Sequence, residues 1–352
     1  MSSILSYSGI SAKTRAMNGK LIKPAQYEQL IHCSTVSDAV AYLKQLPAYR
    51  ETLSEFDEES SHRGTIEMML TSSLYHDFNR LYLFANPEQK RYLDLHRMHF
   101  EVAFLKDCLH SAYAGSSFTE KPAYYREFFE RRSRLHYDEL THSRSIEEFI
   151  QALSNTCFYA PLMRIHNSEY NSLFDYEVGF DQFYFSFLWK SKDKILSGKE
   201  LDLITDNYGT RIDLLNIQWI MRAKQFYRMS PTELYAMIIP CYYRIKPKDI
   251  TAMVEAEKPE ELTAAVSSTY YGRKYASQIG QLQSIERMYT ALLERIYEMT
   301  GRKNPYSIAP MNAYLYDKEH EINRITSIIE GIRYGMPRRE LASYIIQTKK
   351  SQ

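Results

Sequence analysis

The sequence predicts an all-α fold, and three observations support this class. Apolar residues recur at spacings of three and four over long stretches, which is the period of one helix face. Glycine and proline number only 12 each in 352 residues, so breaks between helices are few. Stretches in which apolar and polar residues alternate, the pattern of a half-buried strand, are rare.

The first third of the chain predicts five helices separated by polar or proline-containing breaks. They cover about 4–18, Lys23-Pro24 through Leu30, the Thr35 cap to near Pro47, about Thr65 to Asn86-Pro87, and about 88–113. Thr35 and Asp38 suit a capping box, in which each side chain accepts from the backbone of the other residue. The acidic, polar segment around 54–64 predicts an exposed connection.

This pattern recurs at a constant offset, which indicates a second copy. The corresponding pairs are Tyr27 and Tyr137, Leu30 and Leu140, His32 and His142, Leu43 and Leu153, and Tyr49 and Tyr159. Thr35 and Asp38 correspond to Ser145 and Glu148, so the second copy begins its helix with the same capping chemistry.

A third copy follows, in which Lys23-Pro24 recurs as Lys246-Pro247. Pro259 replaces Ile146 at a first helical position, where proline is favoured. The offset of roughly 110 residues exceeds the roughly 20–50 residues of solenoid repeats, so each copy has the size of a domain. We therefore predict three similar helical domains, covering residues 1–117, 118–228 and 229–352.

The last long helix of the third copy runs over 314–337. Its apolar stripe consists of Leu315, Ile322, Ile325, Ile329 and Ile332. Gly335 and Pro337 provide its end, since glycine adopts the backbone conformation a helix end needs and proline cannot continue the helix.

Acidic residues recur near the end of each copy, at Glu101, Asp213 and Glu321. We interpret them as solvated helix charges. The alternative interpretation is that each is a partly buried partner for an arginine.

Bulk composition excludes several classes of protein. The net charge of +1 gives no general attraction to nucleic acid or anionic lipid. Four distant cysteines without a CxxC pair argue against a zinc site or a disulfide scaffold and fit a reducing compartment. The beginning of the chain lacks the pattern of a secretory signal, and the most apolar run, 235–243, is too short to span a bilayer. We expect a soluble chain without a direct membrane span.

The 30 tyrosines are an unusual number. We interpret them as lining helix surfaces, with the ring buried and the hydroxyl in water. Enrichment at a protein interface is the alternative.

No catalytic motif is present, because the GxxxxGK[ST], GxGxxG, GxSxG and HExxH patterns are all absent. His96 and His99 lie three apart on an expected helix, as two metal ligands can. The flanking acids Asp94 and Glu101 would point to other sides of that helix, so no third ligand is evident locally. We favour a solvent-facing pair, and we predict no catalytic residues, no cofactor and no metal.

Two basic clusters occur, at residues 126–134 and at Arg338-Arg339. The first alternates with acids and aromatics, as a helix surface does. The second falls in the first turn of a final helix, where positive charge opposes the helix dipole and leaves room for a negatively charged partner. We favour a solvated face for both.

Several stretches resemble a known family. The run from Tyr314 to Ile325 (YLYDKEHEINRI), followed by EGIRYGMP up to Pro337, closely resembles the C-terminal signature of the C subunit of archaeal and bacterial V-type (A-type) ATPases. The eukaryotic counterpart is the d subunit of the V-ATPase. The run from Ser11 to Ile22 and the segment 27–49 are also similar, and the resemblance covers essentially the whole chain.

The resemblance implies three similar helical domains around a pseudo-threefold axis, forming a funnel. It also implies a non-catalytic central-stalk rotor subunit that joins the D and F subunits of the stalk to the membrane ring of proteolipid subunits. Its action would be coupling ATP turnover to proton or sodium transport, on the cytoplasmic face of the membrane.

The candidate interface or domain-packing residues are Lys318, Glu319, Asn323, Arg324, Arg333, Arg338 and Arg339. A free-standing α-helical scaffold that binds other proteins is the first alternative function. A helical enzyme with an unrecognised site is the second.

Overall fold

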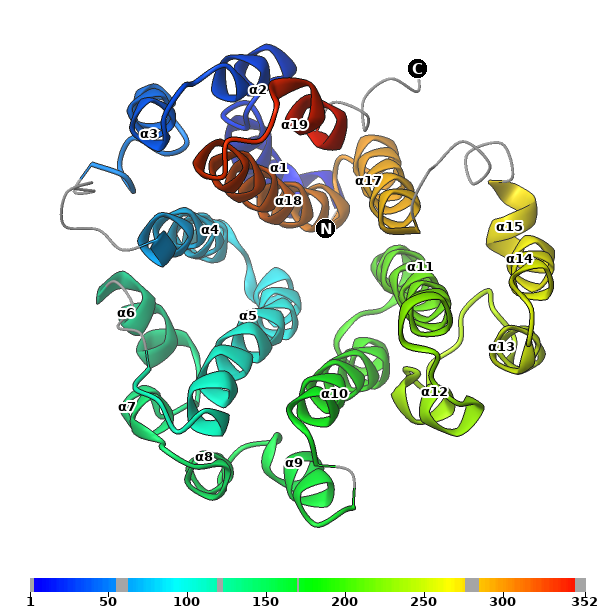
Figure 1. Ribbon diagram of the computed structural model, residues 1–352. Coiled ribbons are helices and arrows are strands. Elements are labelled where there is room, and N and C mark those ends of the chain that lie inside the picture. Colours follow the sequence, from blue (N-terminus) through cyan, green and yellow to red (C-terminus); the bar gives the residue numbers. More distant parts are fainter. Residues whose placement is uncertain (1–2, 55–62, 119–122, 170, 276–284, 346–352) are drawn as a thin grey trace. The chain divides into compact units, whose positions relative to one another are not determined.

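The computed structural model describes residues 3–54, 63–118, 123–169, 171–275 and 285–345. Within these residues the chain forms helices and no strand, which confirms the predicted all-α class (Figure 1). Most of the predicted connection at 54–64 lies outside the described residues. The contacts divide the chain into two compact units, and the predicted boundaries of three domains stay predictions.

Unit 1 comprises Met1–Gln89, Glu120–Phe128 and Tyr297–Gln352. Its complete helices are α1 (Ser3–Asn18), α2 (Pro24–Ile31), α3 (Val36–Gln45), α4 (Arg63–Phe84), α18 (Ala309–Arg333) and α19 (Arg338–Ile345). Parts of α5 (Pro87–Tyr113), α6 (Ala123–Arg132) and α17 (Ile285–Lys303) also belong to it.

Unit 2 comprises Lys90–Thr119 and Phe129–Ile296, which include most of α5. Its complete helices are α7 (Tyr137–His142), α8 (Ile146–Ala152), α9 (Tyr159–His166), α10 (Leu173–Ile195), α11 (Gly198–Arg222), the π-helix η1 (Ala223–Tyr227), α12 (Pro231–Met237), α13 (Pro247–Glu255), α14 (Pro259–Ser268) and α15 (Tyr270–Lys274).

Unit 1 is built around α18, which contacts α1, α2, α3 and α4 (Figure 1). Its predicted stripe turns inward, since Leu315, Ile322, Ile325 and Ile329 are buried and Ile332 is half-buried. Burying such a side chain contributes about 1.5–3 kcal/mol. The first and last segments of the sequence therefore share one hydrophobic core.

Unit 2 packs α10 against α9 and α11, and α13 against α11, α12 and α14 (Figure 1). Its core includes Leu188, Ile204, Ile217, Leu234 and Met253, each 0–1% exposed. Aromatic rings add to it, and Phe104 stacks on Phe129 and Tyr137 with ring centroids 4.5 and 5.2 Å apart.

Two predicted helix ends are confirmed, the cap at Thr35 and the end at Gly335, whereas the last long helix begins at Ala309 and not at Tyr314. Thr35 accepts from the Asp38 N–H and Asp38 accepts from the Thr35 N–H, so the capping box is complete. Gly335 has φ +65°, and the Met336 N–H donates to the Gly331 carbonyl at 2.8 Å. This is the Schellman closure that a glycine at the helix end permits.

Corresponding residues of the copies occupy corresponding elements. The ring of His32 lies 2.7 Å from the Glu28 carbonyl at the end of α2, and the ring of His142 lies 2.6 Å from the Asp138 carbonyl at the end of α7. Lys246-Pro247 opens α13 as Lys23-Pro24 opens α2, and Pro259 is the first residue of α14. The two histidines therefore occupy equivalent structural positions.

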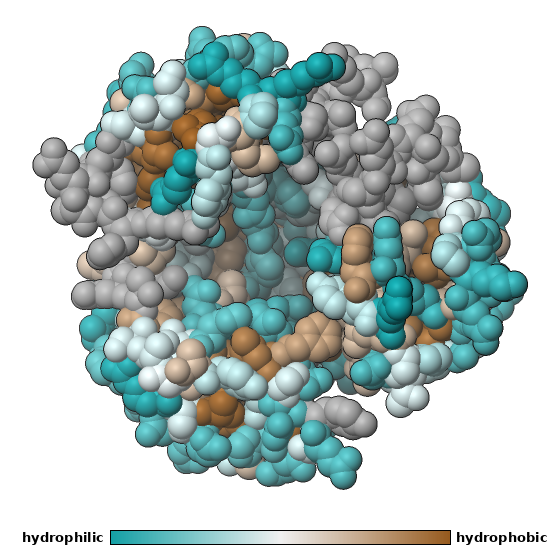
Figure 2. Space-filling model, viewed as in Figure 1, coloured by the Kyte–Doolittle hydropathy of each residue, from teal (hydrophilic) through white to brown (hydrophobic). Residues whose placement is uncertain are grey.

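The prediction that tyrosine hydroxyls reach water is wrong for a large group. Nine tyrosines are at most 2% exposed: Tyr49, Tyr75, Tyr92, Tyr176, Tyr184, Tyr208, Tyr271, Tyr297 and Tyr314. Several bond to carboxylates or histidines instead, because a buried hydroxyl needs a partner inside. On the face drawn in Figure 2 the described surface is mostly hydrophilic, with hydrophobic residues in separate patches.

Candidate functional site

The seven residues proposed from the sequence lie on α18 and α19 with very different access to solvent. Lys318 is fully buried, Glu319, Arg324 and Arg333 are half-buried, and Asn323, Arg338 and Arg339 are exposed.

Lys318 acts inside unit 1. Its Nζ lies 3.2 Å from Glu321 Oε1 and 3.9 Å from the centroid of the Tyr49 ring. A cation over an aromatic face is attracted by the ring, and the carboxylate balances its charge. The side chain is therefore used in packing and is closed to a binding partner.

Three of the arginines also make contacts within unit 1. Arg338 Nη2 donates to the His32 carbonyl at 3.1 Å, which ties α19 to the end of α2. Arg333 Nε lies 3.7 Å from Glu330 Oε1. Burial raises the pKa of Tyr27, and the nearby Arg324 guanidinium opposes that rise. Asn323 and Arg339 remain exposed at the surface.

Glu321 stands at the centre of a buried hydrogen-bond cluster and is only 3% exposed. The Ile22 N–H donates to Glu321 Oε2 at 2.5 Å, and the Tyr49 hydroxyl donates to Oε1 at 2.6 Å. With Lys318, these groups give both carboxylate oxygens a donor. We call this set the Glu321 cluster.

Asp213 on α11 has a similar environment in unit 2 and is 1% exposed. Three consecutive backbone N–H groups donate to it, from Tyr243 to Oδ1 at 3.1 Å and from Arg244 and Ile245 to Oδ2 at 2.6 and 3.0 Å. The Tyr271 hydroxyl donates to Oδ2 at 2.9 Å. We call this set the Asp213 cluster.

Glu101 on α5 is 6% exposed and forms the third example. It pairs with Arg97, one turn earlier on the same helix, and accepts a short hydrogen bond from the Ser133 hydroxyl. Ser133 Oγ in turn accepts from the Leu135 N–H at 3.1 Å.

These contacts overturn the interpretation of the three acids as solvated helix charges. Each is buried, and for Glu101 the alternative of an arginine partner is correct. The backbone N–H groups that donate to Asp213 directly precede Lys246-Pro247, and the Ile22 N–H that donates to Glu321 directly precedes Lys23-Pro24. Ser133, which donates to Glu101, lies at the position that corresponds to Lys23. In terms of the predicted copies, each acid therefore bonds where the second helix of the next copy begins, and Glu321 of the third copy does so in the first.

The sequence feature that indicated this role was the recurrence of an acid at the same place in each copy. A solvated surface charge is not required at any particular position, so it would not be expected to recur there. The identity of the donors was beyond sequence reasoning. Backbone N–H groups carry no residue signature, and the backbone donors of Asp213 and Glu321 lie far from them along the chain.

The perturbed titrations around these acids have structural causes. Burial raises the pKa of Glu101, and Arg97 and Ser133 oppose the rise. Burial also raises the pKa of Asp213, and its three backbone N–H donors and Tyr271 oppose it. Tyr49 has a pKa well above its usual value because it is buried and lies beside the Glu321 carboxylate. All three shifts follow from packing within the chain.

His96 and His99 do not form the predicted solvent-facing pair. His96 is 5% exposed, and its Nδ1 lies 3.1 Å from the Tyr208 hydroxyl. The prediction is wrong because this face of α5 is turned toward Tyr208 of α11. The described residues hold no group of three or more His, Cys, Asp or Glu side chains arranged for a metal ion.

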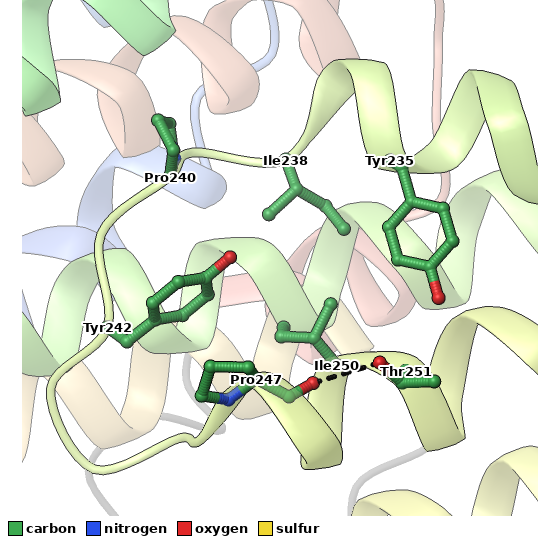
Figure 3. Close-up of a pocket in the computed structure, with 7 residues that line it drawn as sticks. All are labelled: Tyr235, Ile238, Pro240, Tyr242, Pro247, Ile250 and Thr251. Carbon is green, nitrogen blue, oxygen red and sulfur yellow. Dashed lines mark hydrogen bonds between the residues drawn. The ribbon is translucent and has the colours of Figure 1, made fainter.

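A small cavity of about 190 Å³ lies in unit 2 between α12, α13 and the loop that joins them (Figure 3). Its lining is Tyr235, Ile238, Pro240, Tyr242, Pro247, Ile250 and Thr251. The Thr251 hydroxyl is turned to the Pro247 carbonyl at 3.2 Å. Apart from two tyrosines no titratable group lines it, and its volume is below the roughly 300–1,000 Å³ of ligand sites. It therefore offers no acid–base pair for catalysis.

Comparison with known proteins identifies the family. Residues 10–344 match the family model of the ATP synthase (C/AC39) subunit. The chain belongs to this family. The predicted resemblance to the C subunit of A-type ATPases is thereby confirmed.

Relatives that carry a name match this chain over most of their own length, and their name agrees with this family. The C subunit of the A-type ATP synthase of Methanocaldococcus jannaschii is 22% identical over 349 residues, covering 97% of this chain and 86% of that protein. The protein of the same name from Thermococcus kodakarensis is 23% identical over 345 residues, covering 96% and 90%. No helix in the described part of this chain is both long and apolar enough to cross a membrane.

Proposed function

We propose that this chain is a non-catalytic central-stalk rotor subunit of a V-type ATPase or ATP synthase. It joins the D and F subunits of the stalk to the membrane ring of proteolipid subunits, so that ATP turnover is coupled to proton or sodium transport. The observation that carries the proposal is the family match over residues 10–344, with relatives named as the C subunit of A-type ATP synthases along nearly their whole length.

Within this proposal the three copies are the three domains of a funnel about a pseudo-threefold axis. The chain sits on the cytoplasmic face of the membrane through its partners, has no span of its own and binds no nucleic acid.

The chemistry of the buried acids supports a mechanical role. A catalytic acid or base needs an open hydrogen-bonding position toward a substrate. Glu101, Asp213 and Glu321 instead direct their oxygens to donors of the same chain. Charge-assisted hydrogen bonds are about twice as strong as neutral ones, so these clusters resist displacement of one copy against the next. A rotor element needs that resistance to transmit torque.

Binding to the stalk tests the proposal. The purified full chain is mixed with a complex of the D and F subunits, and size-exclusion chromatography is combined with an ATPase assay. We expect co-elution with this complex and no nucleotide hydrolysis by the chain alone. Robust hydrolysis by the isolated chain contradicts the proposal. Failure to bind the stalk complex or the ring, with binding to unrelated peptides, favours the free-standing scaffold.

The exposed members of the predicted interface set are tested in the same assay. Arg339→Glu reverses a charge at an exposed position of α19, and Lys303→Glu does so at an exposed position at the end of α17. If α19 faces a partner, Arg339→Glu weakens assembly and Lys303→Glu does not. Equal assembly of both variants removes Arg339 from the candidate interface.

A further inference from the structure

The long helices that carry the three buried acids share a common ending. The residue that terminates each one has a left-handed backbone: Gly115 with φ +60° after α5, Arg228 with φ +49° after η1, and Gly335 with φ +65° after α18. At the two glycine ends the closing bonds have the same pattern, from the Ser116 N–H to the Ser111 carbonyl and from the Met336 N–H to the Gly331 carbonyl. These ends are ordinary helix terminations.

The ending after α11 departs from this pattern. The chain from Asp213 to Arg228 is one residue longer than the chains from Glu101 to Gly115 and from Glu321 to Gly335. The π-helix η1 accommodates the extra residue, and its closing bond runs from the Met229 N–H to the Ala223 carbonyl. Single π-turns within α-helices are frequent at functional sites.

Arg228 adds backbone strain to the ending after α11. It is the one non-glycine residue with positive φ in the described part of the chain, and a bulky side chain is disfavoured in that conformation. The two equivalent positions carry glycine. Backbone strain of this kind persists where surrounding structure enforces it, most often at functional positions.

The strained turn presents two adjacent aromatic side chains to solvent. Phe226 is 63% exposed and Tyr227 is 67% exposed, and Gln225 and Arg228 on either side are exposed as well. We call residues 225–228 the aromatic turn.

The aromatic turn lies in a basic stretch. No acidic residue occurs between Asp213 and Glu233, and the charged residues in that interval are Arg222, Lys224 and Arg228. Lys224 donates to the Ala256 carbonyl at 2.7 Å. Arg222 and Arg228 are exposed and lie close to the two rings along the chain. The corresponding stretches after Glu101 and Glu321 contain acids as well as bases, so this charge pattern belongs to one copy.

We propose that the aromatic turn is a docking point for a protein partner that offers an apolar pocket bordered by carboxylates. The inference rests on the proposed function, because the partner is another member of the same rotary complex. Aromatic residues and arginine are the residue types that most often carry binding energy at protein interfaces. An inserted residue and a strained arginine hold two adjacent rings outward at this end, whereas the two ordinary ends expose one ring each, Tyr113 at 48% and Tyr334 at 64%.

A lipid surface fits the aromatic turn less well. Recognition of anionic headgroups uses clusters of about 4–8 basic residues, whereas this turn has two exposed arginines, Arg222 before it and Arg228 within it. Two adjacent rings with a short basic border match a pocket on a protein more closely.

The test uses the full chain assembled with the stalk subunits and the proteolipid ring. The double variant Phe226→Ser/Tyr227→Ser is compared with Tyr113→Ser, which removes an exposed tyrosine at the end of α5. We expect the double variant to keep its helical circular dichroism and to bind its partner at least about tenfold more weakly, as loss of an interface hot spot does. Tyr113→Ser binds like the wild type. A photo-crosslinking amino acid at position 226 then attaches to one other chain of the complex.

Arg228→Glu tests the acidic border of the pocket. We expect weaker binding at low salt and a smaller dependence of affinity on salt, because a charge contact is lost. Unchanged affinity at both salt concentrations contradicts the proposal that carboxylates border the pocket of the partner.

Two further results overturn the proposal as a whole while leaving the proposed function in place. In the first, the wild type joins the complex, the probe at position 226 crosslinks to no other chain and the double variant binds normally. In the second, the wild type sediments with vesicles of phosphatidylcholine and phosphatidylserine and the double variant does not. Failure of the wild type itself to join the complex contradicts the proposed function instead.

Discussion

The Glu321 cluster of unit 1 and the Asp213 cluster of unit 2 solve the same problem in different ways. Both bury a carboxylate beside the backbone that precedes a Lys-Pro helix start, and both use a tyrosine hydroxyl as a further donor. Glu321 has the buried cation Lys318 at 3.2 Å. Asp213 has three consecutive backbone N–H donors and, among the described residues, no ion pair.

The difference shows two ways of stabilising a buried carboxylate. Taking an ion out of water costs several kcal/mol, and a counter-ion or oriented dipoles must offset that cost. A cation such as Lys318 must itself be buried, so its removal leaves an unbalanced charge. Backbone N–H groups are present in any case, so the Asp213 cluster fixes a loop conformation without adding a second ion. The Asp213 cluster therefore depends on its acid, whereas the Glu321 cluster depends on both ions.

The largest effect is expected from removing the acid of unit 2. Asp213→Ala leaves three backbone N–H groups and the Tyr271 hydroxyl without their acceptor, and each such group costs about 1–3 kcal/mol. We expect a loss of about 5 kcal/mol or more in the free energy of unfolding. Urea unfolding followed by tryptophan fluorescence reports on unit 2, because Trp189 and Trp219 both belong to it.

Asp202→Ala is the matched control for this measurement, since Asp202 is exposed on the same helix. Its expected effect is within about 0.5 kcal/mol. A loss of similar size in both variants would show that the hydrogen bonds of Asp213 contribute little.

Removing the cation of unit 1 is expected to have the next largest effect. Lys318→Met keeps the volume and leaves Glu321 as a buried charge without its partner, which costs about 3–5 kcal/mol. The double variant Lys318→Met/Glu321→Gln removes both charges and should be more stable than Lys318→Met alone. Urea unfolding followed by circular dichroism measures the coupling, since unit 1 contains no tryptophan. Additive losses in the double variant would contradict a coupled ion pair.

A smaller loss of stability is expected from removing the tyrosine hydroxyl of either cluster. Tyr271→Phe and Tyr49→Phe each delete one hydroxyl that donates to a buried carboxylate, at a cost of about 1.5–3 kcal/mol. We expect the larger loss for Tyr271→Phe, because Glu321 retains Lys318 when Tyr49 loses its hydroxyl. The two free energies of unfolding are compared directly. A larger loss for Tyr49→Phe would mean that the cation does not substitute for a hydroxyl donor.

The helices, the caps and the repeats could be predicted from the sequence because they depend on neighbouring residues. Thr35 with Asp38 and Gly335 with Pro337 are local signals, and the structure places a cap and a helix end at them. Prediction from the sequence failed for Glu101, Asp213 and Glu321, which have the sequence pattern of surface charges on helices. Their burial depends on where another copy of the repeat places its backbone.

The same limit applies to the aromatic turn. The sequence 222–229 has the pattern of the basic end of a helix, and nothing in it marks Arg228 as left-handed. Only the comparison with Gly115 and Gly335, once the fold was known, identifies the inserted residue.

The smallest expected effect concerns the pH dependence of unit 2. Burial raises the pKa of Asp213 above its unfolded value, so the folded chain binds a proton more tightly than the unfolded chain does. Stability that depends on this group is fully present below the unfolded pKa and declines as pH rises through the folded pKa. Between pH 7 and mildly acidic pH, the wild type should therefore gain stability relative to Asp213→Asn, which does not titrate. The tryptophan-monitored free energy of unfolding is measured for both at each pH, with Asp202→Asn as the control at an exposed site. A relative loss of wild-type stability on acidification would show that the three N–H donors outweigh burial and lower the pKa of Asp213.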